Sequence, residues 1–342
     1  MKKVQILMST YNGEKYLKEQ IESILKQQEV EISILVRDDG SQDSTIEILK
    51  QLSINPLITY YEGENLGPAK SFMDLVNKAN ENFDYYAFAD QDDIWMPQKI
   101  TSAIKKLESS ENTPALYISA QEIVSENLNT IGVKKVGGTH TFEGEIIRNF
   151  ATGCTMVMNK KLLNIIKKYT PNYIIMHDSW ITRVCYAIGG NVIIDENSYI
   201  KYRQHGKNAW GYKDDSFKKL KKQFKIAFID KISMRENIAK ELKQGYEKML
   251  TPNAKEVVEN LISYRTNINA KKWLLKNKKF RTNSAKLNAK VRLSIILNKF
   301  WYSFGSFWEL LGTPSKSFSP KQLLLEGVPK SSQKLPKEYQ SR

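Results

Sequence analysis

Carboxylate, hydroxyl and amide side chains follow four apolar runs in the first third of the chain. The four polar segments are Thr10-Tyr11-Asn12, Asp38-Asp39-Gly40-Ser41, Asn65-Leu66-Gly67 and Asp90-Gln91-Asp92-Asp93. Carboxylate oxygens are hard ligands that suit Mg²⁺ or Mn²⁺, and these ions complete their coordination with water and substrate phosphates. The Asp38-Asp39 pair can accept hydrogen bonds from a base or a ribose, and Tyr11 can stack on a base. Together the segments are typical of a site for a nucleoside diphosphate with a bridging metal ion.

The apolar runs before these segments are predicted strands of one sheet. They are Val4–Met8, Ile32–Val36, Leu57–Tyr61 and Tyr85–Ala89, each followed by a polar turn and a helical pattern. This repeat predicts an α/β fold with a mostly parallel sheet and helices on both faces. Because the carboxyl ends of parallel strands share one edge, where ligands of open sheets bind, the polar segments are expected to converge there.

The next hundred residues have a less regular pattern. Further strands are predicted at 115–120, 155–159, 192–195 and 199–202, and helices at 161–169 and 178–188.

Two common nucleotide-binding motifs are missing from the sequence. No G-x-G-x-x-G follows the first predicted strand, and no G-x-x-x-x-G-K-[ST] occurs, which argues against a dinucleotide enzyme and a P-loop nucleotidase. The 342 residues include only two cysteines, Cys154 and Cys185, which is typical of a reducing, cytosolic compartment. The first apolar run predicts a strand rather than a signal peptide, and the apolar runs are shorter than the roughly 18 residues of a transmembrane helix.

The charge of the chain is divided unevenly along its length. Residues 211–342 hold 29 Lys and Arg against 11 Asp and Glu, a net charge of +18, whereas residues 1–210 have a net charge of −3. This asymmetry predicts an anionic partner for the second part: membrane lipid, a phosphorylated substrate or nucleic acid.

Four motifs resemble those of a known enzyme family. STYNGEKYL, VRDDGSQDST, ENLGPAKSF and FADQDDIWMP, in this order, resemble the nucleotide-binding half of family 2 glycosyltransferases, the inverting enzymes of GT-A fold. The resemblance covers residues 1–210 and implies a Rossmann-like, mostly parallel sheet. We therefore expect a catalytic domain over 1–210, with a nucleotide-sugar-binding half over 1–110 and an acceptor half over 111–210. A basic, mostly helical region over 211–312 and a loose tail over 313–342 are expected to follow.

The resemblance also implies roles for residues of the four motifs. In that family, the residues at the positions of Thr10 and Tyr11 hold the nucleotide base, and the residue at the position of Asp39 forms a hydrogen bond with the base. Asp90 is expected near the ribose and diphosphate, and Asp92 is expected to coordinate the metal, Mg²⁺ or Mn²⁺. Asp93 is expected either to take part directly in the site or to have only a structural role. The full set expected to bind the nucleotide sugar is Thr10, Tyr11, Asn12, Asp38, Asp39, Asn65, Gly67, Lys70, Asp90 and Gln91.

A second group of residues is expected on the acceptor side. Asp178 stands at the start of a predicted helix, where an aspartate is ordinarily a cap, but the family places its catalytic base at such a helix start. A single aspartate can both cap the helix and act as the base. His177 and Trp180 beside it, and Thr152 and Gly153 in the ATGCTMVMN segment, are expected to line the acceptor.

The YRQHGKN segment follows the last predicted strand and contains two further candidates. His205 is expected to bind the metal or a phosphate, with a solvated loop as the alternative, and Arg203 is expected to offset charge on the leaving diphosphate. The Q-x-x-R-W signature of processive synthases is absent from the sequence, so transfer of one sugar per event is expected.

The donor predicted by the motifs is dTDP-L-rhamnose, because FADQDDIWMPQKI, HDSW and YRQHGKN look most like bacterial rhamnosyltransferases. UDP-galactose or UDP-glucose is the alternative donor. Two other classes also fit parts of the sequence: a Mg²⁺-dependent phosphohydrolase or nucleotidyltransferase, and a non-catalytic protein that binds lipid or nucleic acid.

The basic second part has a run between residues 271 and 300 with ten Lys and Arg and no acid, followed by an aromatic cluster over 300–308. One interpretation is a helical appendage that packs on the catalytic domain. The other is a surface that rests on an anionic membrane, which places the enzyme on the inner face of the cell membrane next to a polyprenyl-diphosphate-linked saccharide acceptor. Nucleic acid is not expected as a partner, because a sugar-nucleotide site has no need of it.

Overall fold

The first four strands form the parallel half of one sheet. In this computed structural model, which describes residues 1–205 and 234–297, they pair in the order β3-β2-β1-β4, and all neighbours are parallel. The strands are β1 Lys2–Thr10, β2 Val30–Asp38, β3 Ile58–Glu62 and β4 Tyr85–Ala89, and the helices between them are α1 Leu17–Leu25, α2 Thr45–Leu52 and α3 Pro68–Lys78. The predicted alternation of strands and helices is confirmed.

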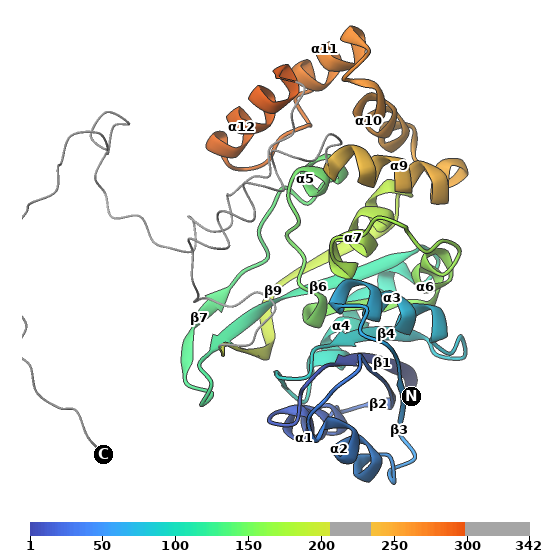
Figure 1. Cartoon of the computed structure of the whole chain (residues 1–342), viewed down its shortest axis with the longest axis vertical. Helices are drawn as coiled ribbons and strands as arrows, with labels where there is room; N and C mark the ends of the chain where they lie inside the picture. Colours follow the sequence, from blue (N-terminus) through green and yellow to red (C-terminus); the bar gives the residue numbers. More distant parts are fainter. Residues whose placement is uncertain (206–233, 298–342) are drawn as a thin grey trace, which may run out of the picture. The chain divides into compact units, whose positions relative to one another are not determined.

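The second half of the sheet is mixed. It continues in the order β4-β8-β6-β9-β5, with β7 paired to β6, and β8 runs antiparallel to both of its neighbours (Figure 1). The strands are β5 Ile94–Trp95, β6 Ala115–Val124, β7 Thr130–Lys134, β8 Met156–Asn159 and β9 Asn191–Arg203, and the helices are α4 Lys99–Leu107, α5 Phe142–Ile147, α6 Lys160–Ile166 and α7 His177–Ala187. Short 3₁₀ turns stand at Glu108–Ser110 and Gly153–Thr155.

The last strand differs from its prediction. The sequence predicts two strands at 192–195 and 199–202, but β9 is one continuous strand that pairs with β6. The register between the two strands shifts near Ser119 and Ala120, so the polar residues between the two predicted strands are absorbed as a bulge.

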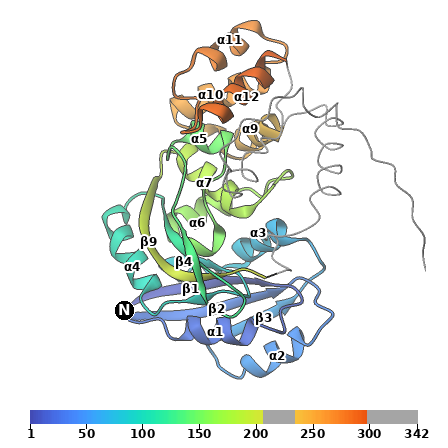
Figure 2. The same ribbon diagram turned by 90° about the vertical axis from the view of Figure 1, so that its left-hand side faces the viewer.

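The sheet is covered by helices on both faces, as predicted. Val4, Ile6 and Met8 of β1 pack with α1, α2 and α4, whereas Leu7 packs on the other side with α3, α6 and α7. Figure 2 shows α1 and α2 on one side of the strands and α3, α6 and α7 on the other. The side-chain period of two along β1 thus directs alternate residues into two separate cores.

Four helices follow in the described part of the C-terminal region. They are α9 Met234–Tyr246, α10 Pro252–Ser263, α11 Ile268–Lys276 and α12 Ala285–Ile296, with a 3₁₀ turn at Glu247–Met249. Apolar residues of these helices share one core with α3, α6 and α7, and the Thr251 N–H donates to the Ala187 carbonyl at 2.9 Å. The predicted helical character is confirmed for these residues. The expected boundary at 210/211, the aromatic cluster over 300–308 and the tail lie outside the described residues.

None of the helices in the described ranges is long and apolar enough to cross a membrane.

Glu241 is the main polar link between α9 and the loop after α6. Its carboxylate accepts hydrogen bonds from the Tyr169 hydroxyl at 2.6 Å and from the backbone N–H groups of Asn172 and Tyr173 at 2.9 and 3.0 Å. Because the carboxylate is buried and removing it leaves these donors unpaired, we expect Glu241→Ala to lower the free energy of unfolding by about 3 kcal/mol. Urea denaturation measures this change.

The control is Glu247→Ala, which removes an exposed carboxylate 3.7 Å from Lys243. It is expected to change the stability by about 0.5 kcal/mol or less. Equal effects of the two substitutions would show that α9 is not held by Glu241.

Candidate active site

The four polar segments meet at the carboxyl edge of the parallel strands, as predicted. The Thr10 hydroxyl donates to the Gln91 side-chain oxygen at 2.6 Å, and the Asn12 N–H donates to the Ser41 hydroxyl at 2.8 Å. Asp39 accepts hydrogen bonds from the backbone of the third segment. Direct bonds therefore join each segment to another.

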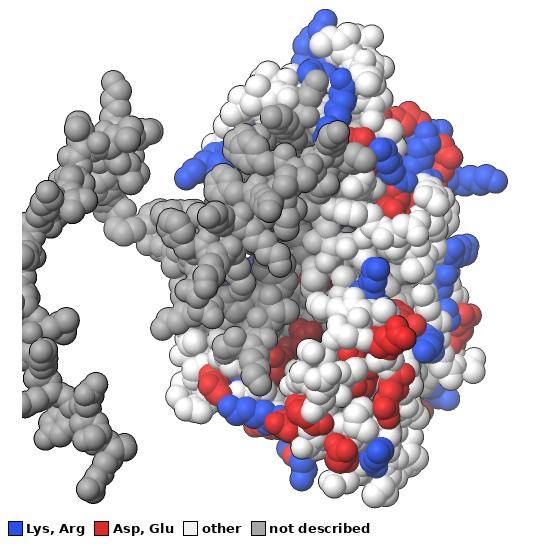
Figure 3. Space-filling view, viewed as in Figure 1, with Lys and Arg blue, Asp and Glu red and all other residues white. Residues whose placement is uncertain are grey.

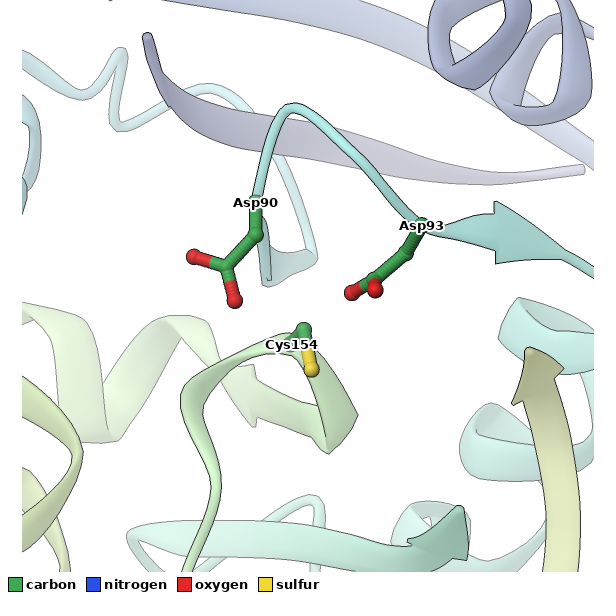
Figure 4. Close-up of side chains that lie close together, drawn as sticks. All are labelled: Asp90, Asp93 and Cys154. Carbon is green, nitrogen blue, oxygen red and sulfur yellow. The ribbon is translucent and has the colours of Figure 1, made fainter. Parts of the chain in front are cut away.

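The loop after β4 has the densest group of carboxylates. Figure 4 shows Asp90 and Asp93 pointing toward Cys154, which lies in the 3₁₀ turn Gly153–Thr155. One ligand atom from each of the three lies within 4.8 Å of the others. Burial, together with the charges of Asp92 and Asp178, raises the pKa of Asp90 to about 7. Asp93 is fully buried and accepts the Arg203 N–H at 3.2 Å.

Asp92 and His205, the two predicted metal ligands, are brought together from distant parts of the chain. The His205 Nε2 atom lies 2.7 Å from the Asp92 carboxylate, and the Tyr16 ring packs 4.9 Å from the imidazole. A carboxylate and a neutral imidazole form a donor set that suits Mn²⁺ and, through the carboxylate, Mg²⁺. The residues present therefore fit a divalent cation.

Asp178 stands at the start of α7, where the sequence places it. Its side chain accepts hydrogen bonds from the Ser179 N–H and from the Asn149 amide at 3.3 Å. Burial raises the pKa of Asp178 to about 6, against the opposing effect of the Ser179 N–H and the Arg183 charge. A carboxylate with such a pKa is ionised at neutral pH and is still basic enough to take a proton.

The expected base-binding residues surround an exposed tyrosine. Tyr11 is 45% exposed, so its ring is open to stacking. Gln91 accepts the Tyr11 N–H at 2.8 Å and donates back to the Tyr11 carbonyl at 3.1 Å, which fixes the end of β1 against the carboxylate loop. Asn12 has a φ of 48° and accepts the Gln42 N–H at 2.8 Å. Asn65 and Lys70 are exposed on either side of the start of α3.

Asp38 and Asp39 both accept hydrogen bonds from the loops that surround them. Asp38 accepts the Ser41 N–H at 2.8 Å and the Ser41 hydroxyl, so it closes the turn after β2. Asp39 is ion-paired with the buried Arg37 and accepts the N–H groups of Leu66 and Gly67, each at 2.9 Å. Both carboxylates therefore help to hold the loops beside the exposed Tyr11 ring. Gly67 has a φ of 74°, a backbone conformation that favours glycine.

His177 and Trp180, which are expected on the acceptor side, are both buried in the structure. Each is 2% exposed. The His177 ring stacks on Phe72 with the ring centres 4.0 Å apart, burial lowers its pKa to about 3, and it lies under Gly153. Trp180 packs in the core against Tyr246. Thr152 and Gly153 remain at the site, because the Gly153 N–H bonds Asp178.

Arg203, which is expected to contact the diphosphate, has several protein partners in the structure. The side chain is buried and donates to the carbonyls of Asp92 and Glu126 at 2.9 and 2.7 Å and to the Glu19 carboxylate. Its guanidinium therefore holds the loop after β4 in place.

Sequence reasoning missed Asn149 and Lys134. Asn149 bonds both backbone groups of Ala151 and the side chain of Asp178, and the Lys134 amine lies 3.4 Å from the Thr152 hydroxyl. Neither residue belongs to a motif, and only the folding of their loops brings them to the site.

Comparisons with known proteins agree with this geometry. The family model described as glycosyl transferase family 2 matches residues 5–166. A relative in Shigella flexneri, named dTDP-rhamnosyl transferase RfbG, is 34% identical over 221 residues, which cover 60% of this chain and 73% of the relative. An Escherichia coli relative, named UDP-Glc:alpha-D-GlcNAc-diphosphoundecaprenol beta-1,3-glucosyltransferase WfgD, is 30% identical over 162 residues, 47% of this chain and 62% of the relative.

Solved structures agree on the fold. The S. aureus TarS 1–349 structure in complex with UDP aligns with a TM-score of 0.51 at 19% identity and covers 81% of this chain and 76% of that chain. A further S. aureus TarS structure aligns with a TM-score of 0.52 at 16% identity, over 86% of this chain and 52% of that chain. With its sheet, its carboxylate edge and these relatives, the chain belongs to glycosyltransferase family 2, has the GT-A fold and is a glycosyltransferase.

Proposed function

We propose that the protein is a metal-dependent, inverting glycosyltransferase that moves one L-rhamnose from dTDP-rhamnose to a saccharide acceptor in bacterial cell-surface polysaccharide assembly. The observation that carries the chemistry is the convergence of Asp178 with the carboxylate loop, since the charge of Asp178 raises the pKa of Asp90. Such a pairing puts a base on one side of the reacting carbon and the diphosphate-binding groups on the other.

Asp178 acts as the general base. It takes the proton from the acceptor hydroxyl while that oxygen attacks the anomeric carbon of the donor. The bond from this carbon to the diphosphate oxygen breaks, and the nucleoside diphosphate leaves with the bonding electrons. Because the oxygen arrives opposite the leaving group, the configuration at the anomeric carbon inverts.

Asp92 and His205 would hold the divalent cation, because the His205 Nε2 atom lies only 2.7 Å from the Asp92 carboxylate. When bound, Mg²⁺ or Mn²⁺ supplies positive charge for the diphosphate of the donor. The transfer therefore combines a carboxylate base with an electrostatically stabilised leaving group.

The sugar is inferred from the relatives. The name of the Shigella relative supports dTDP-rhamnose, and the name of the E. coli relative supports UDP-glucose as the alternative donor. That second name also gives an acceptor whose sugar is joined to a lipid by a diphosphate, which supports a lipid-linked acceptor for this protein.

The helices α11 and α12 support a position on an anionic membrane. Lys286, Lys290 and Arg292 of α12 are exposed, and Leu293 and Ile296 on the same helix are each 55% exposed. Figure 3 shows Lys and Arg at the end of the molecule that holds α11, and both acidic and basic side chains over the part that holds the sheet. Exposed apolar and basic side chains on one helix suit the surface of an anionic bilayer, and we place the protein on the inner face of the cell membrane.

Asp178→Asn tests the base. We expect transfer at pH 8 to fall at least 100-fold, because the amide cannot take the proton, while donor binding is kept. In the wild type, activity needs the ionised carboxylate, so the rate should rise with pH through about 6 and level off above it. Initial rates of transfer across pH 5–9 measure both effects. Asp84→Asn, which alters a carboxylate at the other end of β4, is the control, and full activity of Asp178→Asn contradicts the assignment.

A thermal-shift panel tests the donor and the metal. A ligand that binds the folded state raises the melting temperature, so dTDP-rhamnose with Mn²⁺ or Mg²⁺ is expected to give a larger rise than UDP-glucose or UDP-galactose. In Asp92→Asn the metal-dependent part of this rise should disappear. A larger rise with UDP-glucose would assign the alternative donor, and no rise with any of the three sugars would contradict the proposed reaction.

Charge reversal on α12 tests the membrane surface. The triple variant Lys286→Glu/Lys290→Glu/Arg292→Glu is expected to bind phosphatidylglycerol vesicles at least 100-fold more weakly, since each basic side chain contributes about 1 kcal/mol near an anionic surface. Sedimentation with vesicles measures the binding. The matched control, Lys18→Glu/Lys50→Glu/Lys105→Glu, makes the same charge change at exposed lysines of α1, α2 and α4. Equal loss of binding in both triples would show that only net charge matters.

A further inference from the structure

The loop between α5 and the 3₁₀ turn Gly153–Thr155 reaches Asp178 through one side chain, that of Asn149. The Asn149 Oδ1 atom accepts the Ala151 N–H at 3.0 Å. Its Nδ2 atom donates to the Ala151 carbonyl at 3.2 Å and to the Asp178 Oδ1 atom at 3.3 Å. A backbone N–H can only donate, and a carbonyl and a carboxylate can only accept, so these contacts fix which way the amide faces. One amide group therefore ties the loop backbone to the carboxylate.

The same loop meets the carboxylate a second time at Gly153. The Gly153 N–H bonds Asp178. A Cβ atom at Gly153 would lie 2.4 Å from the His177 Nε2 atom, so the backbone passes directly over this buried ring. Ala151, which comes just before, is 6% exposed and packs in the core. By bonding both backbone groups of Ala151, Asn149 sets the course of the chain into the residue whose N–H meets the base.

The start of the loop is tied to α7, the helix on which Asp178 stands. The Arg183 guanidinium of this helix donates to the Glu145 carbonyl at 3.2 and 3.1 Å. The Glu145 carboxylate in turn accepts the Phe150 N–H at 3.3 Å. The residues on either side of Asn149 are therefore held against the helix of the base, which restricts movement of the amide relative to the carboxylate.

The Asp178 carboxylate needs donors because it is buried and lies among charges of both signs. The neighbouring ionisable groups are Asp90 of the loop after β4, Lys134 of β7, Glu145 of α5 and Arg183 of α7. Burial raises the pKa of Asp178, and a hydrogen bond donated to the ionised form opposes this rise. Asn149 donates such a bond without adding a charge to the site.

We propose that Asn149 is a positioning residue for the base: its amide aims the Asp178 carboxylate and stabilises the ionised form that takes the proton of the acceptor hydroxyl. This inference rests on the proposed function and deepens it. In the transfer itself the proton moves from the acceptor hydroxyl to Asp178, and Asn149 keeps its own protons. Asn149 thus acts through Asp178 and lies outside the four sequence motifs.

Two substitutions separate the amide's effect on the base from its effect on the loop. Asn149→Ala removes every contact of the amide. Asn149→Asp keeps the size of the side chain and an acceptor for the Ala151 N–H, but replaces the donor to Asp178 with a second negative charge. The matched control is Asn197→Asp, because the exposed Asn197 amide donates in the same way to another carboxylate, that of Asp195, at 3.1 Å.

The first measurement needs no substrate. In protein labelled with ¹³C at the aspartate carboxyl carbons, the Asp178 signal is the one that Asp178→Asn removes, and its chemical shift across pH 4–9 gives the pKa. We expect the pKa of Asp178 to rise by about one pH unit in Asn149→Ala, the size of one hydrogen bond to a charged group. It should rise further in Asn149→Asp, where a like charge is added, and stay unchanged in Asn197→Asp.

The second measurement is sugar transfer. Because activity needs the ionised base, the rise of the rate with pH should move to higher pH by the same amount as the pKa. The ratio of the rate at pH 6 to the rate at pH 8 should therefore fall about fivefold in Asn149→Ala, while the KM for the donor changes less than about threefold. Asn197→Asp should keep the wild-type ratio.

Two results overturn the inference. If the pKa of Asp178 is the same in the wild type and both Asn149 variants, the amide does not act on the base. If both variants lower the rate by the same factor at every pH, Asn149 only holds the loop. Thermal unfolding checks that each variant is folded, and Asn149→Asp decides the matter if Asn149→Ala is not. The titration is done without substrate, so it stays separate from a failure of the proposed function, which would appear as absence of transfer by the wild type.

Discussion

The buried guanidinium of Arg203 is the interaction on which the geometry of the active site depends. It joins the end of β9 to the carbonyl of Asp92, to the carbonyl of Glu126 and to the carboxylate of Glu19, while its own N–H bonds Asp93. A buried charge is tolerated only when its donors are paired, so these contacts must form together. His205 comes two residues later and is thereby held against Asp92. The residue that the sequence suggests as a diphosphate ligand therefore also positions the Asp92 loop.

The second constraint is the accumulation of negative charge at the carboxyl edge. Asp90 and Asp178 each have a pKa raised by burial, and the charge of Asp178 also acts on Asp90. Such an arrangement is unfavourable for the isolated fold, but it is what a divalent cation and a proton-accepting base require. Two basic groups lie nearby: the buried Lys99 amine packs on the Trp95 ring, and the Lys134 amine lies 3.4 Å from the Thr152 hydroxyl.

The strands and the convergence of the four motifs were predictable, because apolar runs followed by polar turns specify parallel strands whose carboxyl ends coincide. The pairing of strands that lie far apart in the sequence was not predictable. The contact of Asp92 with His205 depends on β9 lying beside β6 and β5, and the bulge that makes β9 one strand has no signature in the sequence. The family resemblance nonetheless singled out both Asp92 and His205, which the structure brings within 2.7 Å of each other.

The sequence by itself determined the fold class, the carboxylate edge, the position of Asp178 at a helix start and the division of charge along the chain, since all of these follow from local patterns and residue types. Only the tertiary structure decided which polar residues face the site. Four residues have side chains that could bind a substrate and follow predicted strands or begin a predicted helix, yet these side chains are buried and hold loops and cores together. They are Asp38, Asp39, His177 and Arg203. Whether a polar side chain meets a substrate or the protein depends on the partners that packing brings to it, and those partners are distant in sequence.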